Sequence, residues 1–508
     1  MSFLPSLNPI PSLPKYPGPY TVGTIDVEFP LSLLPPVTPH TPPDTSHIKT
    51  LLFRIFYPAI PDPHPQRATW LSHPQRQHIA AYGGFLGLNK ALSEVLSWVP
   101  RHLHWTVLPA HKNATMVQPP PDGKWPTAIF SHGLGGTRNT YSHIAGSLAS
   151  HGVVVFCIEH REQSAALTTI RDPDEKTGSK VVEYKRLPHE LNKEVWGVRD
   201  AQLRVRLWEV ALLYEVLVKL GRGEGDVVEG NLNSSTPRDV FAQFLGKLNV
   251  LDPGRVIFAG HSFGGSTVVQ LLKSVFYADH SILKDKVITE RLFIPSSTAS
   301  IRQQITPHTP TILLDMWCLP LVSPTTRCLY HLPLPAYTPS GPGGSTILAI
   351  ESDAFVVWRP HLHTKAQLFS PSPSLSHKTP ITLESFGDFP QPYWFYPVGS
   401  AHIAQSDFAP LFPTLIRHGF KCEADVGRVL RLNVRAMVQF LRGRGYRVTG
   451  TARGECVEGL GNVASEGDWI DDDAVILERG DGKVEGWKAI EVVGLGGERG
   501  LIREEARI

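Results

Sequence analysis

The sequence predicts an α/β fold in which a mostly parallel central sheet is covered by helices on both faces. From residue 127 onward, short apolar runs rich in β-formers alternate with longer segments of helical spacing. The runs are continuously apolar rather than alternating, as strands buried on both faces require. The chain has 508 residues and 42% hydrophobic residues, which suffices for one large decorated domain or for two.

The expected elements follow in chain order. Upstream of the alternating region, 18–27 is expected to begin an outer strand, 51–57 to form a strand, and 79–99 to be helical. The remaining strands are expected at 127–131, 153–158, 256–259, 311–314, 346–350 and 393–396, and the helices at 140–150, 194–220 and 267–275.

Composition divides the chain into three parts. Residues 1–50 are Pro-rich and are expected to be extended, apart from the outer strand. Residues 51–448 are expected to form the catalytic domain, with long loop insertions at about 221–245 and 276–310. Residues 449–508 are rich in Gly and acidic residues, which predicts a loosely packed and partly disordered tail.

Charge and cysteine content exclude several classes of protein. The net charge of +2 implies no strong attraction to nucleic acid. The five cysteines are scattered and give neither a disulfide framework nor zinc-ligand spacing. The N-terminus is interrupted by prolines, and no run of apolar residues is long enough to span a bilayer. We therefore expect a cytoplasmic protein without a signal peptide or transmembrane segment.

The most informative motif is Gly260-His261-Ser262-Phe263-Gly264, which has the form G-x-S-x-G. An apolar run precedes it and a helical segment follows it. Strand, sharp turn and helix are the context of a nucleophile elbow, which presents the serine hydroxyl at the end of a strand. The pattern predicts the α/β-hydrolase fold, with Ser262 as the nucleophile.

A second motif, Ser131-His132-Gly133-Leu134-Gly135-Gly136, follows directly after a predicted strand. It has the H-G-x-G form of an oxyanion loop, whose glycines let the backbone approach a substrate. Two rigid N–H groups stabilise the negative charge that acyl transfer places on the carbonyl oxygen. We assign these donors to Leu134 and to Phe263.

The order of a triad in this fold predicts an acid and then a histidine after the serine. His402, in Gly399-Ser400-Ala401-His402, is the best candidate, because His418 sits in what looks like a helix end. Two acids qualify: Asp315 ends one predicted strand, and Asp353 follows the next. Either would lie at the carboxyl edge of the sheet, so pattern alone leaves both open.

These motifs resemble those of the platelet-activating factor acetylhydrolase family, in its plasma and type II forms, over roughly residues 17–445. In that family the acid is the aspartate of a Leu-Asp-x-Trp motif, so the resemblance assigns the role to Asp315. Asp353 then becomes a neighbouring pocket or surface residue. The segments that carry the resemblance are Gly18-Pro19-Tyr20, Phe130-Ser131-His132-Gly133-Leu134-Gly135, Glu159-His160-Arg161, Gly260-His261-Ser262-Phe263-Gly264-Gly265, Leu314-Asp315-Met316-Trp317 and Gly399-Ser400-Ala401-His402.

The resemblance implies calcium-independent hydrolysis of short or oxidised sn-2 acyl chains, above all acetyl, from glycerophospholipids. It implies Ser-His-Asp chemistry without a metal or other cofactor. Trp317, Phe355 and Trp358 are bulky residues near the motifs and are candidates for the pocket walls. The alternatives are a general carboxylesterase or lipase acting on other esters and, from a different class, a non-catalytic lipid-binding protein on the same fold.

The expected partner is the phospholipid substrate, and the sequence predicts no protein partner. Two interpretations of 79–99 remain open. It could be an interfacial helix in peripheral contact with a membrane, or a helix packed over the active site. The second is favoured, because the polar face has too few cations for a surface anchor.

Overall fold

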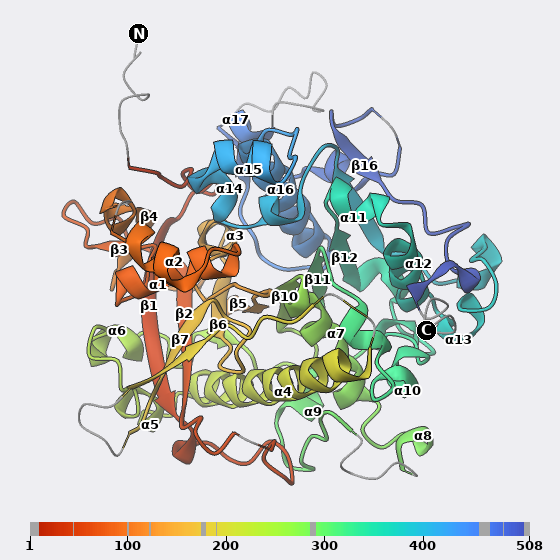
Figure 1. Cartoon of the computed structure of the whole chain (residues 1–508), viewed down its shortest axis with the longest axis horizontal. Coiled ribbons are helices and arrows are strands. Elements are labelled where there is room, and N and C mark those ends of the chain that lie inside the picture. Colours follow the sequence, from red (N-terminus) through yellow and green to blue (C-terminus); the bar gives the residue numbers. More distant parts are fainter. Residues whose placement is uncertain are drawn as a thin grey trace.

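The computed structural model describes residues 10–501, except 44, 99–100, 121–122, 174–178, 189, 191, 285–290, 457–467 and 481. A twelve-stranded sheet crosses the molecule (Figure 1). Its order is β16-β13-β12-β11-β10-β5-β6-β2-β1-β4-β3, with β9 beside β5. The strands are β1 (Thr21–Pro30), β2 (Thr50–Ala59), β3 (Arg67–Thr69), β4 (Val107–Lys112), β5 (Trp125–Ser131), β6 (Val154–Glu159), β9 (Leu248–Asn249), β10 (Ile257–His261), β11 (Thr311–Leu314), β12 (Ile347–Ile350), β13 (Tyr393–Pro397) and β16 (Trp487–Ala489).

The centre of the sheet is parallel from β6 through β5, β10, β11 and β12 to β13. β2 joins β6 and β1 in antiparallel pairing, and β16 is antiparallel to β13. Successive residues of a strand point to opposite faces, so Ile129 and Phe130 of β5 enter two separate cores. The predicted fold class, a mostly parallel sheet of α/β-hydrolase type, is confirmed.

Helices cover both faces, as the continuously apolar strands require. The core on one face includes α3 (Ser142–Ser150) and α16 (Val426–Gly443). The core on the other includes α4 (Lys193–Arg222), α7 (Phe263–Phe276) and α12 (Arg359–Leu368). Figure 1 shows α4 running across the molecule on the opposite side of the sheet from α16. No helix in the described part of the chain is long and apolar enough to cross a membrane.

The segment 79–99 is not one helix. It forms α1 (Gln75–Phe85) and α2 (Lys90–Leu96), which are separated at Gly87, whose φ is 99°. Val95 is 61% exposed and Trp98 is 53% exposed. The interpretation of this segment as a core-packed helix is therefore wrong for α2, because its Leu92 and Val95 side chains are 43% and 61% exposed.

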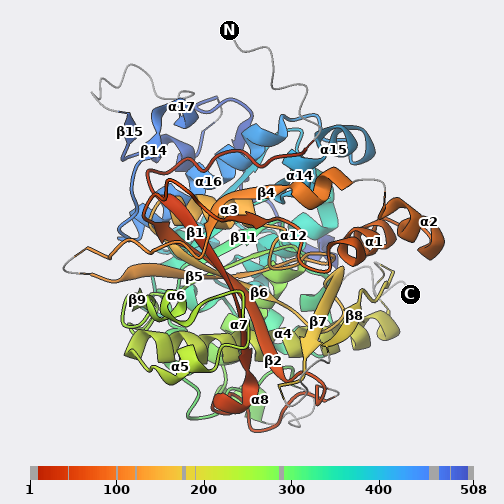
Figure 2. The same cartoon turned by 90° about the vertical axis from the view of Figure 1, so that its left-hand side faces the viewer.

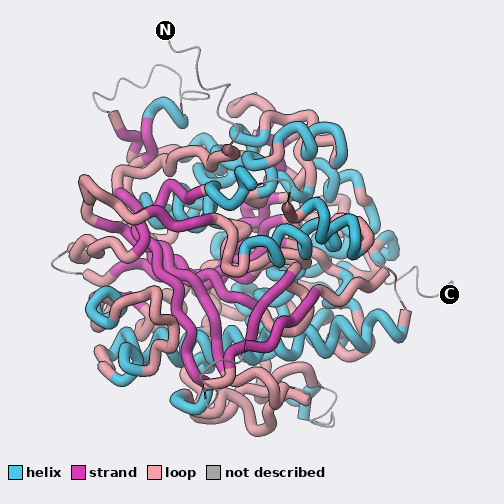
Figure 3. Tube along the Cα trace, turned by 60° about the vertical axis from the view of Figure 1, so that its left-hand side comes forward, coloured by secondary structure: helices cyan, strands magenta, loops and turns pink. Residues whose placement is uncertain are grey.

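A small hairpin that the sequence did not reveal lies beside these helices. It consists of β7 (Leu167–Arg171) and β8 (Ser179–Glu183), which form a separate two-stranded sheet. Figures 2 and 3 show it projecting next to α1 and α2. β8 reads Ser-Lys-Val-Val-Glu and is largely exposed, so it has neither the alternation nor the apolar content that would mark it as a strand in the sequence.

The described part of the acidic tail packs more closely than its composition suggests. β16 extends the main sheet, and Trp487 stacks on Phe395 of β13 with ring centroids 5.4 Å apart. Ile476 and Val492 are fully buried. A few apolar residues among many glycines and acidic residues are enough to pack this segment against the main sheet. The average composition of the segment gives no sign of them.

The remaining short elements lie in the connections. Within the two insertions they are α5 (Asp226–Glu229), α6 (Arg238–Ala242), α8 (Ser281–Lys284) and α9 (Ile301–Gln304). Elsewhere they are α10 (Arg327–Tyr330), α11 (Asp353–Val357), α13 (Pro373–Ser376), α14 (Phe408–Leu411), α15 (Pro413–Gly419), β14 (Thr451–Ala452), α17 (Arg453–Cys456) and β15 (Trp469–Ile470).

Candidate active site

Ser262 occupies a sharp turn between two elements of the core. β10 ends at His261, α7 begins at Phe263, and Ser262 between them has a φ of 55°. Glycine is required beside the serine because neighbouring backbone comes too close for a side chain. A Cβ on Gly264 would lie 1.9 Å from the Ser131 carbonyl oxygen. A non-glycine residue at positive φ is costly and persists where its surroundings enforce it. The geometry is that of a nucleophile elbow.

The two other predicted triad residues are hydrogen-bonded to each other. Asp315 follows β11 and is fully buried, and its Oδ2 lies 2.9 Å from Nδ1 of His402, in the loop after β13. The backbone N–H of Ser352 donates to Oδ1 of Asp315 at 2.6 Å. Burial raises the pKa of Asp315, while Lys365 and the bonds from Ser352 oppose the rise.

The other acid, Asp353, has a different environment. It begins α11, and its Oδ2 accepts the Gly399 N–H at 2.8 Å. The Ser400 side chain accepts the Asp353 N–H at 3.1 Å. Asp353 thus braces the loop that carries His402 and contacts the backbone there. The alternative histidine, His418, lies in the last turn of α15.

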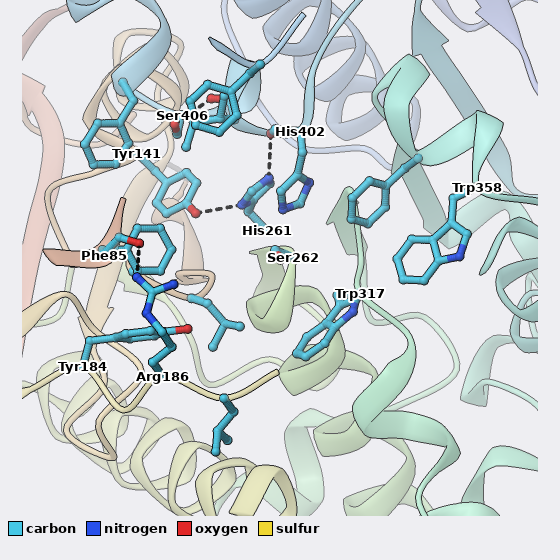
Figure 4. Close-up of a pocket in the computed structure, with 18 of the residues that line it drawn as sticks. Phe85, Tyr141, Tyr184, Arg186, His261, Ser262, Trp317, Trp358, His402 and Ser406 are labelled. Carbon is cyan, nitrogen blue, oxygen red and sulfur yellow. Dashed lines mark hydrogen bonds between the residues drawn. The ribbon is translucent and has the colours of Figure 1, made fainter. Parts of the chain in front are cut away.

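A largely apolar cavity of about 820 Å³ opens above Ser262. The three residues expected as pocket walls, Trp317, Phe355 and Trp358, all line it, and so do Ser262 and His402 (Figure 4). The Phe355 ring stacks on the His402 imidazole, with centroids 4.3 Å apart and planes 6° apart. The other lining residues are Phe85, Leu134, Gly135, Gly136, Tyr141, Tyr184, Arg186, Leu187, Pro188, His261, Ile403, Ser406, Phe408 and Phe420.

The loop after β5 lies against the serine. A Cβ on Gly133 would lie 2.9 Å from Cβ of Ser262, and the next residue, Leu134, lines the cavity. Phe263 is the first residue of α7, so its N–H belongs to the positive end of that helix. Both residues expected to stabilise an oxyanion are therefore near Ser262. Phe263 is the next residue in the chain, and Leu134 follows Gly133, which packs against the serine.

His261, which the sequence analysis passed over, links the two loops of the site. The Gly133 N–H donates to the Tyr141 hydroxyl oxygen at 3.2 Å, and that hydroxyl lies 2.7 Å from His261 Nδ1. His261 Nε2 lies 3.3 Å from the His402 carbonyl oxygen, which can only accept, so Nε2 carries the proton. The two imidazoles also stack at 4.5 Å. Burial holds the pKa of His261 well below its usual value, so the ring is neutral.

A second group missed at the sequence level lies behind Asp315. Lys365 forms an ion pair with Glu351, and both are fully buried. The Trp394 indole N–H donates to Glu351 at 3.0 Å. Burial raises the pKa of Glu351 to about 7, and Asp315 adds to the rise. Glu351 directly follows β12. A charged residue at the end of a buried strand is the feature of the sequence that could have marked this group.

Among the described residues, His261, Asp315 and His402 bring potential metal-ligand atoms within 4.8 Å of one another. All three residues already have partners within the site, because Asp315 Oδ2 and His402 Nδ1 bond to each other and His261 Nε2 donates to the His402 carbonyl. The arrangement fits proton transfer through His402 better than coordination of an ion.

Comparison with known proteins agrees with this geometry. The family model described as "Platelet-activating factor acetylhydrolase, isoform II" matches residues 7–330. The chain belongs to that family. It is 29% identical over 451 residues to a Schizosaccharomyces pombe protein provisionally named a phospholipase A2, covering 85% of this chain and 91% of the relative.

A Cavia porcellus platelet-activating factor acetylhydrolase is 31% identical over 266 residues, covering 51% of this chain and 52% of that protein. A ferulic acid esterase from Streptomyces cinnamoneus aligns over 95% of this chain and 99% of its own at 13% identity and a TM-score of 0.48, which is too weak to bear on function. Membership of the platelet-activating factor acetylhydrolase family makes the chain an ester hydrolase of lipid metabolism.

Proposed function

We propose that this acetylhydrolase-family member is a calcium-independent serine esterase that removes short or oxidised sn-2 acyl chains, especially acetyl, from glycerophospholipids. The observation that carries the proposal is the Asp315–His402 hydrogen bond beside a serine elbow at the base of an aromatic pocket. The names of the guinea-pig and fission-yeast relatives support the phospholipid as substrate.

In the proposed reaction, Ser262 attacks the ester carbonyl while His402 takes its proton. His402 then returns a proton to the leaving lyso-lipid oxygen, and water repeats the sequence on the acyl-enzyme. Asp315 holds the imidazole in the correct tautomer through Nδ1. The N–H groups of Leu134 and Phe263 stabilise the oxyanion. Every step uses groups of this chain, and none calls for a cofactor.

The pocket walls support a preference for short acyl chains. Phe355 is fixed between His402 and His361, with its ring 4.3 Å from the first and 5.0 Å from the second. Trp317 packs edge-on against Phe263, 5.9 Å away. A chain that outgrows this aromatic enclosure either stays in water or collides with rigid rings. Each methylene left unburied forgoes about 0.8 kcal/mol.

A graded series of phosphatidylcholines tests the proposal. Acetyl and butyroyl sn-2 chains should be released orders of magnitude faster than palmitoyl, in chelator as well as in its absence. Equal rates across the series would favour the general carboxylesterase or lipase instead. Loss of activity in chelator would contradict the proposed calcium independence. Hydrolysis confined to non-phospholipid esters would contradict the proposed class of substrate.

We also propose peripheral membrane contact through residues 79–99. Leu86, Leu92, Val95 and Trp98 are all more than two-fifths exposed and belong to the α1–α2 segment, whose Phe85 lines the pocket. Apolar side chains grouped near an opening suit insertion into the interfacial layer of a bilayer.

A further inference from the structure

A second cavity lies beside the catalytic pocket. It measures about 770 Å³ and opens to solvent between α1, α2 and the β7–β8 hairpin. Its lining mixes the apolar or small residues Ala80, Ala81, Gly84, Leu88, Leu167 and Val181 with the charged residues Arg76, Lys90, Glu94 and Glu183 and the polar residues Gln77, Ser93 and Ser97. Phe85, Tyr184 and Arg186 line both cavities, so the two share a wall.

The shared wall is anchored to the oxyanion loop. Gly135 has a φ of 70°, and a Cβ there would lie 2.5 Å from Cζ of Phe85, so the ring rests directly on this backbone. Tyr184 packs edge-on against Phe85 at 4.9 Å. Arg186 donates to the Gly84 carbonyl at 2.8 Å and to the Phe85 carbonyl at 2.6 Å. Figure 4 shows the bond to Phe85. The wall thus joins α1 to the irregular segment that follows the hairpin.

Arg186 remains able to bind an anion. Among the described residues, both of its hydrogen bonds come from Nη2, which leaves Nε and Nη1 for a ligand. It is exposed and lines the edges of both cavities. A planar guanidinium with free N–H groups is suited to phosphate, which it can bind through two parallel hydrogen bonds.

We propose that the second cavity binds the sn-1 hydrocarbon chain of the same phospholipid whose sn-2 ester reaches Ser262, and that Arg186 binds the phosphate between them. The inference rests on the proposed function and specifies its substrate. A glycerophospholipid carries two chains and one anionic phosphodiester on a three-carbon backbone. Two adjoining cavities with a cation on their common wall match that arrangement in number and in the position of the charge between them.

Gly84 offers a sharp test of the second cavity. It lines this cavity, and a Cβ there would meet nothing within 4 Å, so Gly84→Phe should fill the space without displacing α1. Two sn-2 acetyl phosphocholines would be compared as dispersed monomers, one with a hexadecyl and one with a butyl sn-1 chain. In Gly84→Phe, the ratio of kcat/KM for the long over the short lipid should fall about tenfold, a difference of about 1.4 kcal/mol.

Gly197 supplies the matched control. It is an exposed helical glycine of α4, its Cβ would also meet nothing within 4 Å, and it lines neither cavity. Gly197→Phe should keep the wild-type ratio. If Gly84→Phe also keeps it, the sn-1 assignment is overturned while sn-2 hydrolysis, and with it the proposed function, stands. If the wild type hydrolyses neither lipid, the proposed function fails and the inference fails with it.

Arg186→Gln tests the phosphate contact. It should lower kcat/KM about tenfold for an acetyl phosphocholine relative to a neutral analogue with the same two chains. Lys185→Gln removes the same charge one residue away, outside both cavities, and should not change this ratio. An unchanged ratio in Arg186→Gln overturns the phosphate role. A phospholipid carrying a photoreactive group at its sn-1 end should label peptides of α1, α2 or the β7–β8 hairpin in Ser262→Ala, and labelling outside these elements overturns the chain placement.

Discussion

At the scale of single residues, the site concentrates backbone strain. Ser262 has a φ of 55° and Asp315 a φ of 42°, so the proposed nucleophile and the proposed acid both adopt a conformation that residues with a Cβ avoid. Such strain persists only where the surroundings enforce it, and it clusters at functional sites. Here the close packing of the glycines around Ser262 holds the backbone of Ser262, and the hydrogen bond from the Ser352 N–H holds Asp315.

Ser262→Ala should abolish ester hydrolysis while the protein remains folded, because removing a nucleophile typically costs many orders of magnitude in rate. Hydrolysis of a short-chain ester measures the activity, and circular dichroism checks the fold. An organophosphate should label Ser262 in the wild type and leave the variant unlabelled. A folded variant with substantial residual activity would contradict the assignment.

A pair of substitutions tests which of the two acids, Asp315 or Asp353, orients His402. Asp315→Asn should cost about 10⁴-fold in kcat, because an amide stabilises the wrong tautomer of His402. Asp353→Asn should cost far less, because Asp353 accepts a bond from the Gly399 backbone, a role that an amide oxygen can retain. Turnover on the same acetyl ester compares them. If Asp353→Asn proves the crippled enzyme, the acid lies after β12.

At the scale of elements, the strands and motifs were predictable because they obey local rules. The expected strand at 311–314 coincides with β11, and the expected helix at 194–220 lies within α4. The choice between Asp315 and Asp353 was not local: both follow neighbouring strands, and only the path of the loop after β13 brings His402 to one of them. His261 was missed for the same reason, since its partners Tyr141 and His402 lie far away in sequence. Glu351 did carry a local signal, because it is a charged residue directly after a buried strand.

The ends of β11 and β12 hold two buried carboxyls, Asp315 and Glu351, beside one buried cation, Lys365. Both carboxyls have a raised pKa, and that of Glu351 is about 7 rather than its ordinary 4.5. The folded protein therefore holds more protons than the unfolded chain between about pH 4.5 and 7, and the free energy of unfolding decreases as pH rises through that window.

Glu351→Gln should flatten this dependence, because an amide of similar shape does not titrate. Urea unfolding of the wild type and the variant at about pH 5 and pH 7 measures it, and the difference between the two proteins isolates the residue from other groups. Above about pH 7, where Glu351 is ionised in the wild type, the variant should also be less stable, because Lys365 loses its charged partner. Equal slopes in the two proteins would show that Glu351 does not carry this titration.

At the scale of the whole molecule, the site is assembled from loops at one edge of the sheet. Ser262, Asp315 and His402 follow β10, β11 and β13, while the oxyanion loop follows β5. Substrate therefore approaches from this edge, on which the α1–α2 segment contributes Phe85 to the pocket. The sequence predicted that the site lies at this edge of the sheet. It did not predict that apolar residues of α2 are exposed beside it.

Membrane contact through this segment is tested by placing charge on it. Val95→Glu combined with Trp98→Glu should weaken binding to phosphatidylcholine vesicles at least severalfold in a flotation assay, because the charges resist insertion into the interfacial layer. Hydrolysis of a lipid dispersed as monomers should persist. Leu375→Glu is the matched control, since Leu375 is 56% exposed on α13, on the opposite side of the molecule in Figure 1. Equal weakening by the control would locate the contact elsewhere.

The pairing of β16 with β13 has a consequence for folding during synthesis. β13 leads into the His402 loop, yet the strand that covers its outer edge comes almost a hundred residues later in the chain. Until Trp487 reaches Phe395, that edge presents unpaired N–H and C=O groups, the kind of surface through which chains associate wrongly. A nascent or C-terminally shortened chain is thus at risk of aggregation even though every proposed catalytic group has already been made.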